Sequence, residues 1–320
     1  MKIAGSKILI TGGGGLIGSW VTEQLIAKDV AQITVLDNFD RGDRSNLDVA
    51  LKSNRVKLVE GDICDRELVR DLLAESDALV HLAAMRITQC VQDPERARDV
   101  MFTAPFNMFY DAAQLKTKRI VAASSSSIYG QADVFPTTEK HHPFNDDTLY
   151  GASKLASEGI LRSFSKMYDL PSVTMRFFNV YGPRMDIHGV YTEVMVRWLE
   201  RISEGKPPII FGDGTQSMDF TYVSDVAASV VAALESDSRD LAFNVGTGKS
   251  TTLTELASIL CEIMGTKLSP DLKPARGVSP VNYRLADTRL AEEVLGFKAK
   301  VDVHQGMRQL AEYWRANKRG

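Results

Sequence analysis

The sequence predicts a doubly wound α/β fold, in which a parallel sheet carries helices on both faces. Short runs rich in Ile, Val and Leu recur through the first half of the chain, and each has the continuous apolar character of a strand buried on both faces. Stretches with helical periodicity separate these runs. Because strands and helices alternate, we expect the strands to pair in parallel and the helices to cover the sheet on both sides.

The strands expected in this sheet are Lys7–Thr11, Gln32–Asp37, Val56–Glu60, residues 78–82, residues 119–123 and Ser172–Phe177. Between the first two, Ile17, Val21 and Leu25 recur every fourth residue. That spacing is typical of one stripe of a helix packed on a sheet.

Beyond residue 178 the alternation is less regular. A helix is expected over residues 190–204, because Gly205 and the two prolines that follow cannot continue it. Thr252 and Glu255 have the capping-box spacing and should begin a helix that runs to Met264. The apolar run Leu241–Val245 is expected to be a further strand of the main sheet.

The length of 320 residues fits two domains. We expect a cofactor domain over residues 1–178, to which the chain returns around 219–248. A smaller C-terminal α/β domain, mainly residues 179–320, should bind the substrate. The chain has no long linker, so the two should pack side by side with a cleft between them.

Composition excludes several classes of function. The chain has 38 Lys and Arg against 41 Asp and Glu, a net charge of −3, so no field favours nucleic acid or an anionic membrane. No apolar run approaches the ~18 residues of a membrane span or the layout of a signal peptide, so we expect a cytoplasmic protein. Three widely spaced cysteines, Cys64, Cys90 and Cys261, are expected to be buried and reduced, with no metal or redox role. The adjacent His141 and His142 should point in different directions, so we expect no metal site there either.

A glycine-rich turn follows the first strand. The segment Thr11-Gly-Gly-Gly-Gly-Leu-Ile-Gly18 begins the first helix, where backbone N–H groups and the positive helix end can meet a pyrophosphate. Asp37 ends the second strand, where a carboxylate binds both adenosine-ribose hydroxyls and repels a 2′-phosphate. This order of features favours NAD over NADP, against the alternative of a structural turn and an incidental surface acid. Arg41 and Arg44 follow Asp37 closely in the sequence and could bind the 2′-phosphate of NADP.

Gly246-Thr-Gly-Lys-Ser250 resembles the end of a phosphate-binding P-loop. The earlier glycine that such a loop requires falls on Phe243, which belongs to the expected strand. We therefore do not expect an ATPase or GTPase.

Tyr150 and Lys154 lie four residues apart at the start of an expected helix, so they share a face. A phenol is a poor base at neutral pH, and a neighbouring ammonium and an oxidised nicotinamide favour its anion. Tyr150 can then take a proton from an alcohol while carbon gives hydride to the cofactor. A serine from the run Ser124–Ser127, at the C-terminal end of the fifth strand, can share that proton. Taken singly, the Tyr–Lys pair fits an exposed pair and the serines fit local capping.

Together these segments resemble the extended short-chain dehydrogenase/reductase family, in its nucleotide-sugar epimerase/dehydratase branch. The matching motifs are TGxxGxxG from Thr11, Asp37, Asp62-Ile63, His81-Leu-Ala-Ala84, Ser124–Gly130, Tyr150-x-x-x-Lys154, the segment Arg176–Arg184 and Phe211-Gly-Asp-Gly. The resemblance covers nearly the whole chain. It implies a Rossmann fold, bound NAD, Tyr150 as base, Lys154 as its tuner and Ser125 as their partner, with His81 in a packing role. The residues placed at the cofactor are Gly12, Gly15, Leu16, Ile17, Gly18, Asp37, Asn38, Asp62, Ile63, Leu82, Ala83, Ala84, Tyr150 and Lys154.

The resemblance also bears on the reaction. Dehydratases of the family carry an Asp-Glu pair after the catalytic Thr, and decarboxylases resemble them in having a Glu two residues before the tyrosine. Here those positions are Ser126 and Ser127, which cannot act as acid or base at neutral pH. The remaining expectation is 4-epimerisation of a UDP-hexose or UDP-hexuronate through a transient ketone.

The substrate contacts implied are Ser125, Ser126, Asn179, Arg184, Arg276 and Arg284. The family usually has Arg where this chain has Met218, and a thioether cannot replace a bidentate guanidinium. The three arginines just named are candidate replacements, and one that faces the sugar would suit a uronic acid. A solvated arginine is the alternative for each. The family also implies a homodimer through helices near residues 99–114 and Leu149–Tyr168.

Two other functions stay open. The position of Met218 also fits a net dehydrogenase of a free sugar or hydroxy acid. A noncatalytic NAD-binding regulator is disfavoured because Ser125, Tyr150 and Lys154 are all present.

Overall fold

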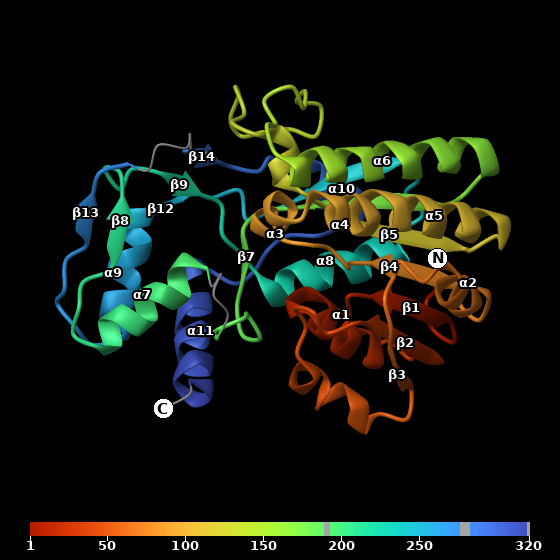
Figure 1. Ribbon diagram of the computed structural model, residues 1–320, viewed down its shortest axis with the longest axis horizontal. Coiled ribbons are helices and arrows are strands. Elements are labelled where there is room, and N and C mark those ends of the chain that lie inside the picture. Colours follow the sequence, from red (N-terminus) through yellow and green to blue (C-terminus); the bar gives the residue numbers. More distant parts are fainter. Residues whose placement is uncertain (189–192, 276–281, 319–320) are drawn as a thin grey trace.

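The computed structural model describes residues 1–188, 193–275 and 282–318. Its largest element, within those residues, is a seven-stranded sheet whose strands are all parallel (Figure 1). In spatial order the strands are β11 (Leu241–Val245), β6 (Ser172–Phe177), β5 (Arg119–Ser125), β4 (Ala78–His81), β1 (Lys7–Thr11), β2 (Gln32–Asp37) and β3 (Val56–Glu60). The predicted doubly wound fold is confirmed.

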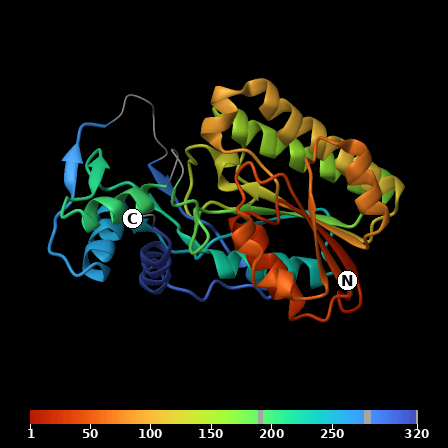
Figure 2. The ribbon, with the colours of Figure 1, turned by 60° about the horizontal axis from the view of Figure 1, so that its bottom comes forward.

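Helices cover both faces of this sheet (Figure 2). One face packs on α1 (Leu16–Ile26), α8 (Val223–Glu235) and α10 (Arg289–Leu295). The other packs on α2 (Arg66–Ala74), α3 (Ile87–Gln92), α4 (Pro94–Arg98), α5 (Ala104–Gln114) and α6 (Leu149–Tyr168). The central strands are therefore buried on both sides, as their continuous apolar runs require.

Three details of the sheet differ from the sequence prediction. β3 is an edge strand with half-buried and exposed residues, so the prediction that every strand is buried on both faces was wrong there. β4 ends at His81, one residue early. β5 continues two residues further, through Ser125, because Ser124 and Ser125 still pair with Arg176 and Phe177 of β6.

The rest of the chain builds a smaller α/β part beside the C-terminal edge of the sheet (Figure 1). Its helices are α7 (Val194–Ser203), α9 (Leu253–Ile263) and α11 (Val303–Asn317). Its short strands are β7 (Val180–Tyr181), β8 (Ile209–Phe211), β9 (Ser217–Met218), β10 (Thr221–Tyr222), β12 (Thr251–Thr252), β13 (Asp271–Lys273) and β14 (Tyr283–Arg284). A separate hydrophobic core holds it together, centred on side chains such as Trp198, Leu260 and Trp314.

The predicted C-terminal ends of the two helices in this part hold to within one residue. The capping box forms, with the Thr252 hydroxyl and the Glu255 carboxylate each bonded to the other's backbone N–H. Glu193 stands at the N-cap position of α7 with an extended backbone and no side-chain cap hydrogen bond, so the helix expected from residue 190 begins at Val194. Residues 190–192 of that prediction lie outside the described residues. In the three described ranges, no helix is long and apolar enough to span a membrane.

Candidate active site

A cavity of about 1740 Å³ lies at the C-terminal ends of the sheet strands, between the sheet and the smaller part of the chain. Every residue that the sequence placed at the cofactor or the reacting groups lines it. So do the expected substrate contacts Ser126, Asn179, Arg184 and Arg284. Arg276 lies outside the described residues. The position agrees with the rule that open parallel sheets bind ligands beyond the carboxyl ends of their strands.

Glycines shape the wall formed by the turn before α1. Gly12 has φ +73°, and a Cβ there would lie 2.6 Å from the backbone nitrogen of Ala83. A Cβ on Gly18 would lie 2.3 Å from the carbonyl oxygen of Gly12. The turn therefore packs tightly against β4 and against its own helix. Gly15 caps α1 without a side chain, which leaves the first N–H groups of the helix facing the cavity for an anion.

Carboxylates stand at the ends of β2 and β3. Asp37 accepts hydrogen bonds from the backbone N–H groups of Gly14 (2.8 Å) and Phe39 (2.9 Å), which fixes its carboxylate beside the turn. Asp62 accepts from the N–H of Cys64 at 2.8 Å and from the Asn38 amide at 3.1 Å. Asp62 also pairs with the Arg96 guanidinium. Asp37, fixed beside the glycine turn, is the carboxylate that suits ribose hydroxyls and disfavours a 2′-phosphate.

The three proposed reacting groups converge on one point of the cavity. Ser125 ends β5, and its hydroxyl lies close enough to the phenol of Tyr150, in the first turn of α6, to act on the pKa of that phenol in the lowering direction. Lys154, one turn further, donates from Nζ to the carbonyl of Ala123 at 2.9 Å and lies 5.9 Å from the centre of the Tyr150 ring. The Ser125 hydroxyl also accepts from the Ser127 N–H at 3.1 Å, so it both caps a turn and faces the phenol.

Burial controls the ionisation of Tyr150 and Lys154. It raises the pKa of the Tyr150 phenol, while the Ser125 hydroxyl and the guanidinium groups of Arg41 and Arg284 act in the opposite direction. The net direction is opposite to the one expected from a neighbouring ammonium, because desolvation of the phenolate outweighs these charges. Burial also lowers the pKa of Lys154 to about 8, so this side chain is still an ammonium at neutral pH.

The expected substrate contacts have distinct surroundings. The Asn179 amide donates to the Asp219 carbonyl at 3.0 Å. Arg184 pairs with Glu23 and lies 5.1 Å from the centre of the Trp20 ring, so this cation already has an anionic partner. Arg284 reaches Ser126 Oγ at 3.4 Å, and its buried Nε has no hydrogen-bond partner.

The structure relates Arg284 to Met218. β14 pairs in parallel with β9, and Arg284 is the register partner of Met218. Both side chains line the cavity. The family usually has an arginine at the position of Met218, and this chain has the Arg284 guanidinium on the neighbouring strand, β14.

Sequence reasoning missed several other lining residues. Arg86 forms an ion pair with Asp186 at 3.5 Å. Arg41, which the sequence offered as a phosphate partner, also lines the cavity and donates to the Ala84 carbonyl at 3.3 Å. Trp198 and Phe211 line the far end of the cavity. Arg86 directly follows the His81-Leu-Ala-Ala84 motif and Met85, and no spacing in the sequence singled it out. Asp186 and Trp198 lie more than 90 residues away along the chain, and no spacing links them to it.

His81 has the packing role expected of it. The ring is buried, lies edge-on to Phe109 and hydrogen-bonds Thr11 Oγ1 at 2.8 Å. Burial, with a smaller effect from the Lys154 charge, lowers the pKa of His81 to about 3. The imidazole is therefore neutral.

The segment that resembles a P-loop binds a side chain. Thr247 and Gly248 donate their backbone N–H groups to the buried carboxylate of Asp219, at 2.8 and 3.0 Å. These groups are occupied by Asp219, in agreement with the rejection of a nucleoside triphosphate site at this position.

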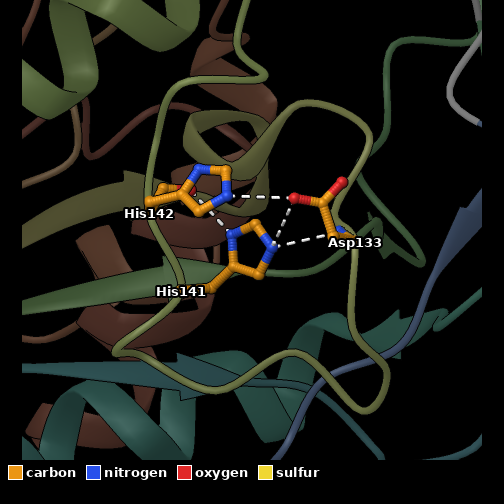
Figure 3. A group of neighbouring side chains, drawn as sticks. All are labelled: Asp133, His141 and His142. Atoms are coloured by element: carbon orange, nitrogen blue, oxygen red, sulfur yellow. Dashed lines mark hydrogen bonds and ion pairs between the residues drawn. The ribbon is translucent and has the colours of Figure 1, made fainter.

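Two expectations about metal-binding side chains were wrong. His141 and His142 do not point apart: their ring centres are 4.5 Å apart and both face Asp133 (Figure 3). The sequence rule failed because the two residues lie in a loop that folds back on itself, where neighbours need not alternate. Cys64 is half-buried, and the Arg96 guanidinium donates to its sulfur at 3.4 Å. Burial raises the pKa of its thiol to about 11, so it stays protonated.

The lining of the cavity has the groups that a dinucleotide site requires. The turn at Gly12 and Gly18 has no room for a side chain. The carboxylates of Asp37 and Asp62 line the cavity after β2 and β3, and the hydroxyl groups of Ser125 and Tyr150 line it after β5 and on α6. A doubly wound sheet with this order of groups at its carboxyl edge defines an extended short-chain dehydrogenase/reductase.

Comparison with known proteins identifies the family within that class. The chain belongs to the NAD dependent epimerase/dehydratase family, whose model matches residues 8–246. It is 33% identical over 313 residues to a UDP-glucose 4-epimerase of Mycolicibacterium smegmatis, covering 97% of this chain and 98% of that one. The solved complex of Thermus thermophilus UDP-glucose 4-epimerase with NAD superimposes with a TM-score of 0.85 at 29% identity, covering 98% and 100% of the two chains. The protein is an NAD-dependent epimerase of this family.

The relatives do not share one reaction. A dTDP-glucose 4,6-dehydratase of Actinoplanes is 30% identical over 337 residues, covering 98% of each chain. Overall likeness therefore assigns the family and the cofactor. The substrate and the exact reaction depend on individual residues in the cavity.

Proposed function

We propose that the protein is a nucleotide-sugar 4-epimerase that acts on a UDP-hexose or a UDP-hexuronate. The observation that carries this proposal is the turn after Ser125. Ser126 and Ser127 are both buried there, and a hydroxyl is neither a carboxylic acid nor a carboxylate. Elimination of water needs a further acid and base at this place, whereas inversion of one carbinol does not.

The glycine turn from Gly12 to Gly18 and Asp37 would hold NAD, which would supply the acceptor for hydride from the sugar C4 and the donor of that hydride to the opposite face of the resulting ketone. Tyr150 takes the proton of the 4-hydroxyl and later gives it back, and the Ser125 hydroxyl lies beside the same phenol. Because burial raises the pKa of Tyr150, its base form depends on surrounding positive charge. Arg41, Arg284 and the Lys154 ammonium contribute to that charge. The Ala123 carbonyl holds Lys154 in place.

A hexuronate is the favoured sugar. Arg284 places a largely desolvated guanidinium beside Tyr150 and Ser126, with one N–H group unpaired. Such a group binds an anion strongly. The charge of Arg184 is already paired with Glu23, although its buried Nη1 also lacks a hydrogen-bond partner, whereas Arg284 forms no ion pair among the described residues. We therefore assign the sugar carboxylate to Arg284, and Asn179 and Ser126 to hydroxyl contacts.

The proposal includes the arrangement of the chain. Residues 1–178 and 219–248 hold the cofactor, and the remainder of 179–320 holds the substrate. We also propose a homodimer through α5 and α6, because Phe102, Phe106 and Met167 expose 44%, 42% and 65% of their surface beside these helices. A dimer mass in light scattering supports this, and a monomer at micromolar concentration contradicts it.

The test is turnover of the purified protein on UDP-glucose, UDP-N-acetylglucosamine and UDP-glucuronate. We expect tightly bound NAD, inversion at C4 and no accumulation of NADH. Tyr150→Phe should lower turnover by about 100-fold or more while NAD stays bound, because it removes the proton acceptor. Stoichiometric NADH release would instead indicate the dehydrogenase. Near-normal turnover of Tyr150→Phe would remove this residue from the mechanism.

A further inference from the structure

The segment of residues 130–148 joins the serine turn to α6 and carries a side-chain cluster that the active site does not use. Asp133, His141 and His142 meet at its surface (Figure 3). One ligand atom of each, a carboxylate oxygen and two imidazole nitrogens, lies within 4.8 Å of the others. We propose that this cluster binds a divalent transition-metal ion of the Zn²⁺ type.

The distances suit such an ion. His142 Nε2 lies 2.9 Å from Asp133 Oδ2, and His141 Nε2 lies 3.9 Å from the same oxygen. In a tetrahedral zinc site, bonds of about 2.0–2.1 Å place the ligand atoms about 3.3 Å apart. The two observed distances lie on either side of that value. Side-chain movements below an ångström therefore bring the carboxylate and each imidazole to ligand spacing.

The neighbouring hydrogen bonds orient two of the ligands. His141 Nδ1 lies 2.7 Å from the His142 carbonyl and donates to it, which leaves the lone pair of His141 Nε2 directed at Asp133. Ligating histidines ordinarily bind a carbonyl or carboxylate through their other ring nitrogen in this way. The Asn145 amide holds Asp133 Oδ1 at 3.0 Å, and Oδ2 remains for the metal.

Metal binding replaces three weaker interactions. The Asp133 N–H leaves His141 Nε2, from which it is 3.0 Å away. The His142 proton that Nε2 shares with Asp133 moves to Nδ1, so the imidazole stays neutral, and the 3.3 Å bond from the Phe144 N–H to His142 Nδ1 is lost. Because protons compete with the metal, affinity should fall in acid.

The donor set and exposure select the kind of ion. Two imidazoles and one carboxylate favour Zn²⁺, Ni²⁺ or Cu²⁺ over Mg²⁺ and Ca²⁺, which prefer oxygen ligands. The side chains of His142 and Asp133 are 43% and 59% exposed, so water completes the coordination. His141, 7% exposed, anchors the site from below.

The proposed metal ion would lie in the segment of residues 130–148, which contacts the active site at both of its ends. The same segment pairs with the strand region of Arg284, because the Thr137 N–H donates to the Leu285 carbonyl at 2.8 Å. It ends at Thr148, which caps α6 two residues before Tyr150. An ion that ties residue 133 to residues 141 and 142 should therefore stiffen this segment and raise thermal stability.

The experiment uses full-length protein without a polyhistidine tag, with its NAD retained, after treatment with a chelator. Calorimetric titration with ZnCl₂ should give one site per chain, and the melting temperature should rise with Zn²⁺ but not with Mg²⁺. His142→Ala should weaken binding by about tenfold or more. His142→Gln is a second variant, which keeps a polar side chain beside Asp133 if the alanine variant folds poorly.

His304→Ala is the matched control. The His304 imidazole is 42% exposed and lies 3.5 Å from a carboxylate oxygen of Glu262, but it is not part of the cluster. This variant should bind Zn²⁺ like the wild type. Equal weakening by His304→Ala, or unchanged binding in a variant lacking both His141 and His142, would overturn the proposal. So would the absence of Zn²⁺ binding by the wild-type protein.

Discussion

Lys154 should make the folded protein less stable at neutral pH than a neutral side chain of similar shape. Its ammonium is buried in α6 and bonded to one backbone carbonyl, and burial lowers its pKa from 10.5 to about 8. Lys154→Met removes the buried charge and keeps most of the apolar stem. This perturbation tests whether the structure describes the electrostatics of the proposed active site correctly.

The size of the effect follows from linkage. In the unfolded chain Lys154 stays protonated up to about pH 10.5, whereas the folded chain prefers the amine above about pH 8. Below pH 8 the charge therefore costs about 3 kcal/mol of folding free energy. This cost disappears as the pH rises from 8 towards 10.5, so the wild-type protein gains stability over that range. Loss of the bond to the Ala123 carbonyl costs the variant about 1–3 kcal/mol at every pH.

The assay is urea unfolding of nucleotide-free protein at pH 7 and pH 10. The stability of Lys154→Met relative to wild type should fall by about 2–3 kcal/mol between the two pH values, because only the wild type loses a buried charge. Lys166→Met is the control, since Lys166 lies on the same helix with its side chain 72% exposed. A Lys154→Met difference that does not change with pH, or that changes as little as the control, would refute the reasoning.

Two further predictions concern binding and rate. The amount of NAD bound per chain in Gly18→Ala should be lower than in the wild type by more than about tenfold, because the added Cβ would lie 2.3 Å from the Gly12 carbonyl oxygen. Gly159→Ala is the control and should keep its NAD, because the space around Gly159 is open. The nucleotide released on denaturation measures the bound NAD in both variants. Arg284→Met should move the acidic limb of the pH–rate profile to higher pH, since the Arg284 charge lowers the pKa of Tyr150. The same variant should raise KM for UDP-glucuronate more than for UDP-glucose, and equal KM changes would argue against Arg284 as the carboxylate contact.

Local spacing along the chain determined much of this protein. The period of apolar residues set the strands and helices, and four-residue spacing placed Tyr150 and Lys154 on one face of α6. The glycine turn and Asp37 followed directly from the order of strand, turn, helix and strand. These features depend on neighbours along the chain, so local patterns were sufficient to predict the fold class and the cofactor, whereas the remaining residues expected at the cofactor came from the family resemblance.

Tertiary packing decided the rest, because it joins residues whose separation carries no periodic signal. Arg284 reaches Ser126 across 158 residues, and only the pairing of β14 with β9 puts it beside Met218. Arg184 is neutralised by Glu23, 161 residues away. The direction of the Tyr150 pKa shift likewise came from burial, which is a property of the assembled cavity. The sequence shows which side chains can carry a charge or transfer a proton. Folding decides which of them contact one another, and these contacts determine the role of each residue.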